Sequence, residues 1–138
     1  GYNYKLSNLS AALGLAQLEK LNFFFKKKKD IRNYYLKKIK DLEGIKILES
    51  PKYSKNNNWL NLVTVSKKEK TKKIIKKLNL NGFQSRPVWY PNHLQKTFRK
   101  NYRYKIKKAE ELVKKIICLP SSANLNKKEI DKIENLLK

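Results

Sequence analysis

The residues most able to do chemistry gather in one stretch of the chain, SRPVWYPNHLQKTF, at residues 85–98. It contains the only histidine, His93, together with Arg86 and the aromatic neighbours Trp89 and Tyr90. Arginine and histidine can donate hydrogen bonds to phosphate or hydroxyl groups, and aromatic rings can wall a ligand site. The same spacing also fits a stiff, proline-rich loop in which Trp89 fills the core. The residues alone leave both interpretations open.

Other site chemistries find little support in the sequence. One histidine, one cysteine and no paired acidic motif cannot supply a zinc ligand set, and no loop resembles a calcium hand. Cys118 lies where an apolar helix is predicted to end, so it is expected to be a packed small residue and not a nucleophile. Asn3, in the opening GYNYK, either shapes the turn before a helix or presents an exposed amide. We predict no metal site and no self-sufficient catalytic site.

Length and charge set further limits. A chain of 138 residues is long enough for one domain with a modest core. The net charge is +23, but only four of the 34 basic residues are arginines, the type suited to bidentate phosphate and base contacts. Thirty lysines favour solvated surfaces, so we expect no nucleic-acid partner. Lysines interrupt every apolar run, so we expect no membrane span, and the single cysteine fits the cytoplasm.

The elements that must position these residues begin with a proline-free helix predicted over residues 7–42. Before the lysines at 26–29 it carries two apolar stripes, formed by Leu6, Leu9, Leu13 and Ala16 and by Leu15, Leu18, Leu21 and Phe25. After them one stripe continues, formed by Ile31, Tyr35, Ile39 and Leu42. A helix that is apolar on two sides is expected to pack against its own domain and against something else. Gly44 is the predicted helix stop.

The rest of the chain predicts a small sheet with helices. Strands are expected at residues 45–48, 59–66 and 83–88, with Pro87 at an edge or a strand end. Helices are expected after the capping-box pair Ser66 and Glu69, over residues 106–117, and after a second such pair, Asn126 and Glu129. Asn81-Gly82 is the predicted end of the first of them. This order predicts a small open sheet with helices on one face.

Several segments resemble one family. GYNYKLSNLSAALGLAQLEKL is similar to the stretch GYNYR-[LM]-S-N-x-x-AALG-x-x-QLE of the PLP-dependent sugar-nucleotide aminotransferases of the DegT/StrS type. NNWLNLVTV, NGFQSRPVWYPNHLQKTF and CLPSSANLNKKEI continue the pattern in order, so the likeness covers the whole chain. The segment with SRPVWYPNHLQ is most similar to the branch that aminates 4-keto-6-deoxy-N-acetylhexosamine nucleotides for bacillosamine- or legionaminic-type surface sugars.

The resemblance implies the C-terminal portion of a fold-type I aminotransferase, an α/β protein that acts as a cytoplasmic homodimer in bacterial surface-glycan biosynthesis. Residues 1–43 would be a long interface helix leading to the large domain, and residues 44–138 a small domain of α+β character. The implied reaction uses pyridoxal 5'-phosphate (PLP) to move an amino group from glutamate to a 4-keto-6-deoxy sugar nucleotide. Asn3 then matches the cofactor-phosphate contact across the dimer, and His93 matches a histidine near the sugar nucleotide.

The resemblance also assigns weaker substrate contacts to Arg86, Trp89, Tyr90 and Lys5. Lys5 departs from the family arginine, which would replace a bidentate contact by a point charge. The family's Schiff-base lysine, pyridine-pairing aspartate and ring-stacking aromatic lie upstream of GYNY, and none of the thirty lysines here occupies that motif. We therefore expect no catalytic residue in this chain and no transamination by it alone.

Three outcomes remain open at this point. The chain is one portion of a longer aminotransferase, or a lysine-rich module that binds nucleic acid nonspecifically, or an inactive truncated remnant that aggregates through uncovered leucines and phenylalanines.

Overall fold

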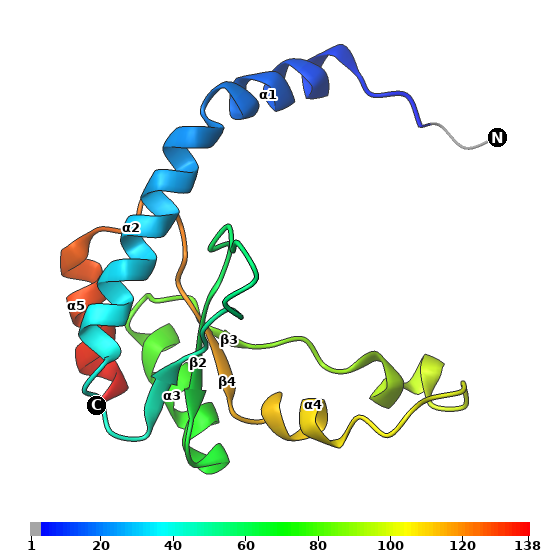
Figure 1. The fold of residues 1–138 in the computed structure, drawn as a ribbon, viewed down its shortest axis with the longest axis vertical. Helices are drawn as coiled ribbons and strands as arrows, with labels where there is room; N and C mark the ends of the chain where they lie inside the picture. The colour runs from blue at the N-terminus through cyan, green and yellow to red at the C-terminus, as the bar shows by residue number, and fades with distance from the viewer. Residues whose placement is uncertain (1–3) are drawn as a thin grey trace.

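The computed structural model describes residues 4–138 and contains one small sheet with helices on one face (Figure 1). In chain order the elements are α1 (Asn8–Glu19), α2 (Leu21–Ile39), β1 (Ile45–Ile47), β2 (Asn61–Val65), α3 (Lys68–Leu80), β3 (Arg86–Pro87), the 3-10 helices η1 (Asn92–Leu94) and η2 (Lys96–Phe98), α4 (Lys107–Leu112), β4 (Ile116–Leu119) and α5 (Lys127–Leu137).

The sheet is antiparallel, with strand order β1-β2-β4-β3. Its register places Val63 opposite Ile117, and Leu62 opposite Cys118. Arg86 is the partner of Cys118 on the other side of β4. Because directly paired residues share a sheet face, Val63 and Ile117 point to one face, while Leu62, Cys118 and Arg86 point to the other.

Helices α2, α3 and α5 cover the face that carries Val63 and Ile117, as the sequence predicted. The buried core there includes Tyr35, Ile39, Val63, Val65, Leu78, Ile117, Ile130 and Ile133. The Tyr35 hydroxyl donates to the Pro120 carbonyl at 3.0 Å, which satisfies a polar group inside this apolar layer. The predicted capping box of α5 is present, with Asn126 and Glu129 bonding each other's backbone N–H.

The helix predicted over residues 106–117 is wrong in its second half. Helix α4 ends at Leu112, and Ile116–Leu119 form the central strand β4, in which all four residues are buried. A short apolar run with two isoleucines suits a strand buried on both faces as well as a helix stripe. Because this segment pairs with β2 on one side and with β3 on the other, it forms a strand and not a helix. Cys118 therefore lies in a strand and not at a helix end, although it is buried as expected.

The long helix predicted over residues 7–42 is interrupted at Lys20. This residue leaves the helical conformation, at φ −97° and ψ 6°, and α1 runs in a different direction from α2 (Figure 1). Helix α2 ends at Ile39, before the expected stop at Gly44. Gly44 takes φ +73° in the turn to β1, where a Cβ atom would lie 2.7 Å from Ser66 Oγ.

Two details around α3 and β3 also differ from expectation. The N-cap of α3 is Lys67, with no side-chain capping bond, so the predicted Ser66–Glu69 capping box is wrong. The Ser66 N–H instead donates to the Gly44 carbonyl at 2.8 Å. The helix does end at Asn81 and Gly82 as predicted. Strand β3 is shorter than predicted, and Pro87 lies in it at the edge of the sheet.

Helix α1 has no buried residue, so neither of its apolar stripes packs on the described part of the chain. Leu9, Leu13 and Leu18 are 83%, 64% and 64% exposed. The expected contact of one stripe with its own domain is therefore wrong for α1. The stripe in α2 is buried as predicted, at Ile31, Tyr35 and Ile39.

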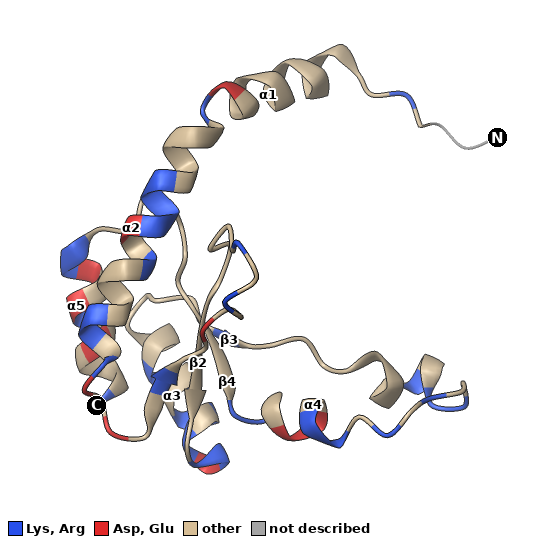
Figure 2. Cartoon of the chain, in the orientation of Figure 1, with Lys and Arg blue, Asp and Glu red and all other residues tan. Residues whose placement is uncertain are grey.

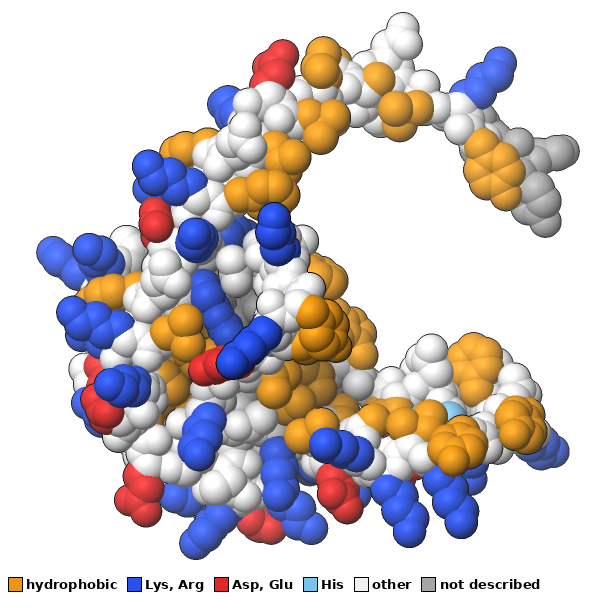
Figure 3. All heavy atoms as spheres, viewed as in Figure 1, with side chains coloured by type: hydrophobic (Ala, Val, Ile, Leu, Met, Phe, Trp, Pro, Cys, Tyr) orange, Lys and Arg blue, Asp and Glu red, His pale blue; other side chains and the backbone are white. Residues whose placement is uncertain are grey.

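The whole molecule is C-shaped. Helix α1 forms one limb, and residues 88–112, which we call the arm, form the other (Figure 1). Hydrophobic side chains gather along the inner side of the C, whereas Lys and Arg side chains mostly point outward (Figure 3). Along the chain the basic residues are spread over α2, α3, α5 and the arm (Figure 2).

Candidate functional site

A cluster of an arginine and two tryptophans lies at the base of the arm. Strand β3 places Arg86 on the sheet face that the helices leave open, and the arm then brings Trp89 back toward it. The Arg86 guanidinium carbon is 5.6 Å from the centre of the Trp89 ring, within range of a cation–π contact. We call Arg86, Trp89 and Trp59 the Arg-Trp cluster.

Trp59 completes this cluster from the segment that leads into β2. Its ring centre is 5.7 Å from that of Trp89, with the planes tilted by 37°. Trp59 is 61% and Trp89 58% exposed, so both rings offer a face to a partner molecule. The sequence predicted Trp89 as a candidate but gave Trp59 no role beyond a strand. It lies near Trp89 because β2 and β3 both pair with β4.

The position of Trp59 is held from α2 by Lys28. Lys28 Nζ donates to the Trp59 carbonyl at 3.4 Å and makes a shorter bond to the Ser121 carbonyl. Burial lowers the pKa of Lys28, because the charged ammonium loses water there. The contact joins segments far apart in the sequence, so no local pattern could have indicated it.

His93 lies further out, in η1 of the arm. Its Nε2 is 2.8 Å from Glu110 Oε1 of α4, and its carbonyl accepts from Arg103 at 3.2 Å. The bond to Glu110 holds the ring against α4 and not against the Arg-Trp cluster. The sequence missed Glu110 as the partner. Tyr90 is 57% exposed, and its carbonyl accepts from Gln95 at 3.3 Å.

The remaining site predictions fall near the start of the chain. Asn3 lies outside the described residues. Lys5 is exposed in the segment before α1, and α1 forms the limb of the C opposite the arm (Figure 1). The structure therefore brings Arg86 and Trp89 together, places His93 and Tyr90 along the same arm, and leaves Lys5 on the opposite limb.

The described residues also bear on metal binding, membrane insertion and thiol chemistry. Residues 4–138 contain no group of three or more His, Cys, Asp or Glu placed to hold a metal ion, and no helix among them is long and apolar enough to cross a membrane. Cys118 lies beside Arg86 on the open sheet face, and burial raises the pKa of its thiol, although the Arg86 charge opposes that shift. A buried thiol with a raised pKa is a packed side chain and not a reactive one.

The side chains of the Arg-Trp cluster determine which kind of ligand it can bind. A guanidinium with two exposed indole faces suits a ligand that carries both phosphate and a ring, because Arg forms forked bonds to phosphate and indoles stack on flat or apolar surfaces. All three residues of the cluster are exposed, so the described part of the chain does not enclose it.

Comparison with known proteins identifies the family. The model of the DegT/DnrJ/EryC1/StrS aminotransferase family matches residues 1–138, so the chain belongs to this family. EpsN of Bacillus subtilis (strain 168) is 30% identical over 99% of this chain and 36% of its own length. Its name describes it as a pyridoxal phosphate-dependent aminotransferase. GDP-perosamine synthase of Escherichia coli O157:H7 is 31% identical over 94% of this chain and 35% of its own length.

The fold comparison agrees with this assignment. The structure of Helicobacter pylori PseC, described as an aminotransferase involved in the biosynthesis of pseudoaminic acid, superimposes with a TM-score of 0.89 at 25% identity. The match covers 99% of this chain and 38% of PseC. The predicted fold class, a long helical segment followed by a small sheet with helices on one face, is confirmed. The chain spans about a third of the length of the curated relatives it matches.

Proposed function

We propose that this chain is the C-terminal portion of a PLP-dependent aminotransferase that transfers an amino group from glutamate to a 4-keto-6-deoxy sugar nucleotide. Membership of the family supports the reaction class. The GDP-linked sugar in the name of one relative and the pseudoaminic acid pathway of another support the substrate class. A cytoplasmic site of action in bacterial surface-glycan biosynthesis, and the bacillosamine- or legionaminic-type branch, are parts of the same proposal.

The observation that carries the proposal is the Arg-Trp cluster at the base of the arm. Arg86 has the charge and geometry to bind the diphosphate of a sugar nucleotide, and Trp59 and Trp89 have exposed faces for its rings. His93 would contribute a further polar contact along the arm, with its ring held by Glu110. In this proposal these residues bind and orient the substrate, and the arm helps to keep water from it.

The described residues alone do not form a complete binding site for PLP. PLP supplies the means of holding and releasing the amino group, and its site needs an accessible lysine. Burial lowers the pKa of Lys28, and a lysine that binds PLP needs a lowered pKa. The Lys28 ammonium, however, is bonded to the carbonyls of Trp59 and Ser121. We therefore assign the chain a share of the substrate site and, through Asn3, a contact to the cofactor phosphate, and no step of the chemistry.

The uncovered α1 helix supports a partner for this chain. Leu9, Leu13, Leu15 and Leu18 are each at least 60% exposed, and apolar surfaces of this extent mark interfaces. We propose that the large PLP domain and the second subunit of a homodimer cover α1. In this arrangement residues 1–43 form the interface segment and residues 44–138 the small domain, with the second half of α2 anchoring the two to each other.

The test is to produce the chain alone and joined to the upstream coding sequence of its locus. We expect cofactor absorbance and glutamate-dependent amination of UDP-, GDP- or dTDP-linked 4-keto-6-deoxy sugars only from the joined form. In that form Arg86→Gln should lower kcat/KM for the sugar nucleotide roughly 10- to 100-fold, the loss of one charged hydrogen bond, mainly through KM. Arg99→Gln, which changes another arginine of the arm, is the matched control. Cofactor binding by the chain alone, or equal effects of the two variants, would contradict the proposal.

A further inference from the structure

A second hollow lies at the end of β2 opposite Trp59, where the turn after α2, the start of α3 and the end of α5 meet. Its volume is about 590 Å³, within the usual range for small-molecule sites. The floor is apolar and includes Ile45, Val65, Ile74 and Leu137. Five lysines line it, namely Lys67, Lys70, Lys73, Lys77 and Lys138, and we call it the lysine cleft.

Few acidic side chains oppose these lysines. Glu43 is the acidic side chain in the lining. Within residues 4–138, Lys138 forms an ion pair, with Glu134 at 2.7 Å, while the other four have no carboxylate within ion-pair distance. Like charges that converge on one cavity repel each other and create a positive potential, which an anion placed among them would relieve.

The cleft also offers a hydroxyl. Ser66 contributes its Oγ to the lining, and this atom makes no hydrogen bond to another described residue. Gly44 allows this placement, because a Cβ at that position would meet Ser66 Oγ at 2.7 Å. Lysine ammonium groups are compact point charges with three donors each, which suits the several oxygens of phosphate groups, whereas no arginine is present to bind in a fork.

We propose that the lysine cleft binds a small oligophosphate, that is, a compact ligand with two or more linked phosphate groups. The rim lysines and Ser66 Oγ would contact the phosphate oxygens, and the apolar floor would accept any ring the ligand carries. The cleft lies at the other end of β2 from the Arg-Trp cluster, so this inference does not depend on the proposed transferase function.

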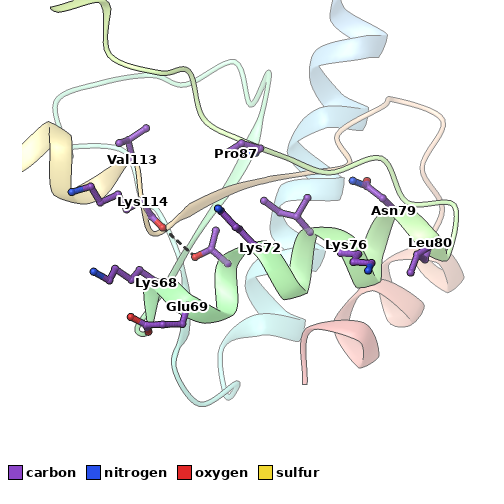
Figure 4. A pocket seen from close by; sticks show the side chains of 11 residues that line it. Lys68, Glu69, Lys72, Lys76, Asn79, Leu80, Pro87, Val113 and Lys114 are labelled. Atoms are coloured by element: carbon purple, nitrogen blue, oxygen red, sulfur yellow. Dashed lines mark hydrogen bonds between the residues drawn. The ribbon is translucent and has the colours of Figure 1, made fainter. Parts of the chain in front are cut away.

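Helix α3 provides a matched control for this proposal. Lys70, Lys73 and Lys77 line the cleft, whereas Lys68, Lys72 and Lys76 of the same helix border a different groove, shown in Figure 4. Changing either triplet to glutamine removes three positive charges from one helix. A general attraction between a chain of net charge +23 and any polyanion would weaken equally in both variants.

The experiment is calorimetric titration with inorganic tripolyphosphate at about 150 mM salt, where exposed charges are screened within roughly 8 Å. We expect one equivalent to bind to the wild-type chain and to K68Q/K72Q/K76Q, and at least tenfold weaker binding to K70Q/K73Q/K77Q. Orthophosphate should bind at least tenfold more weakly than tripolyphosphate. Equal weakening in both triple variants, no binding to the wild type, or equal affinity for orthophosphate would overturn the proposal.

A second measurement avoids any dependence on the folding of the variants. Lysine acetylation of the wild-type chain, followed by mass spectrometry, should show that tripolyphosphate protects Lys70, Lys73 and Lys77 several-fold more than Lys68, Lys72 and Lys76. Uniform protection across α3 would identify the effect as nonspecific and contradict the cleft as a site.

Discussion

Trp59 and Trp89 pack with ring centres 5.7 Å apart, which joins the segment before β2 to the base of the arm. An aromatic pair of this geometry typically contributes about 0.5–1.5 kcal/mol beyond the area it buries. We expect Trp59→Ala and Trp89→Ala each to lower the free energy of unfolding by about 1 kcal/mol, and the double variant to lose less than their sum. Urea unfolding of the four proteins measures the coupling, and strictly additive losses would show that the rings do not interact in solution.

Tyr35 predicts a specific loss of stability at alkaline pH. Its side chain is 1% exposed, and burial first, then the nearby Glu129 charge, raises its pKa well above the ordinary value of 10.0. Because the folded state holds this proton more tightly than the unfolded state, the stabilisation is complete below pH 10.0 and declines as the pH rises above it. Tyr35→Phe should lower stability by about 0.5–1.5 kcal/mol at neutral pH, since the bond to the Pro120 carbonyl is lost. The difference in stability between wild type and variant should then shrink above pH 10.0. A difference independent of pH would contradict this reasoning.

The difference in burial between β4 and α1 predicts different costs of shortening a side chain in each. Ile117 is fully buried in the central strand, so Ile117→Ala should cost about 2–5 kcal/mol. Leu13 is 64% exposed in α1, and Leu13→Ala should change the stability of the chain alone by about 0.5 kcal/mol or less. Chemical denaturation measures both. A large cost at Leu13, measured at a dilution where the chain is monomeric, would mean that α1 packs on a surface of its own chain.

Asp131 should respond to acid. Hydrogen bonds from Lys38 at 2.6 Å and from the Tyr34 hydroxyl at 2.9 Å lower the pKa of its carboxyl below the ordinary 3.8. A depressed folded-state pKa means that this stabilisation is present above pH 3.8 and is lost as the pH falls through the folded value. In Asp131→Asn that part of the acid dependence should vanish. Carbon-detected NMR titration reads the carboxyl directly, and a midpoint at or above 3.8 would refute the shift.

Much of the fold followed from local patterns. The buried stripe at Ile31, Tyr35 and Ile39, the capping box of α5 and the presence of strand β2 were all predicted, because each depends on residues close in sequence. Strand β4 was missed, because Ile116 and Ile117 continue the three- and four-residue spacing of the preceding helix pattern, and only pairing with β2 and β3 shows that they belong to a strand.

The candidate site likewise contains some residues that the local sequence indicated and others that it did not. Arg86 and Trp89 are three residues apart, so one segment indicated both as candidates, and the structure adds the contact between them. Trp59, Lys28 and Glu110 reach the site or its support only through tertiary pairing, and nothing in their local sequence indicates it. The break at Lys20 was likewise invisible, because the residues around it favour a helix and no glycine or proline marks the interruption.

The two free edges of the sheet bear on how this chain can associate with itself. Strand β3 ends in Pro87, which has no N–H to donate, and β1 carries the exposed Lys46 at its centre. A proline and a lysine at these positions discourage another copy from extending the sheet indefinitely. Self-association of the isolated chain should therefore proceed through the exposed apolar surface of α1. It should end in small clusters that detergent disperses, and not in fibrils that bind amyloid dyes.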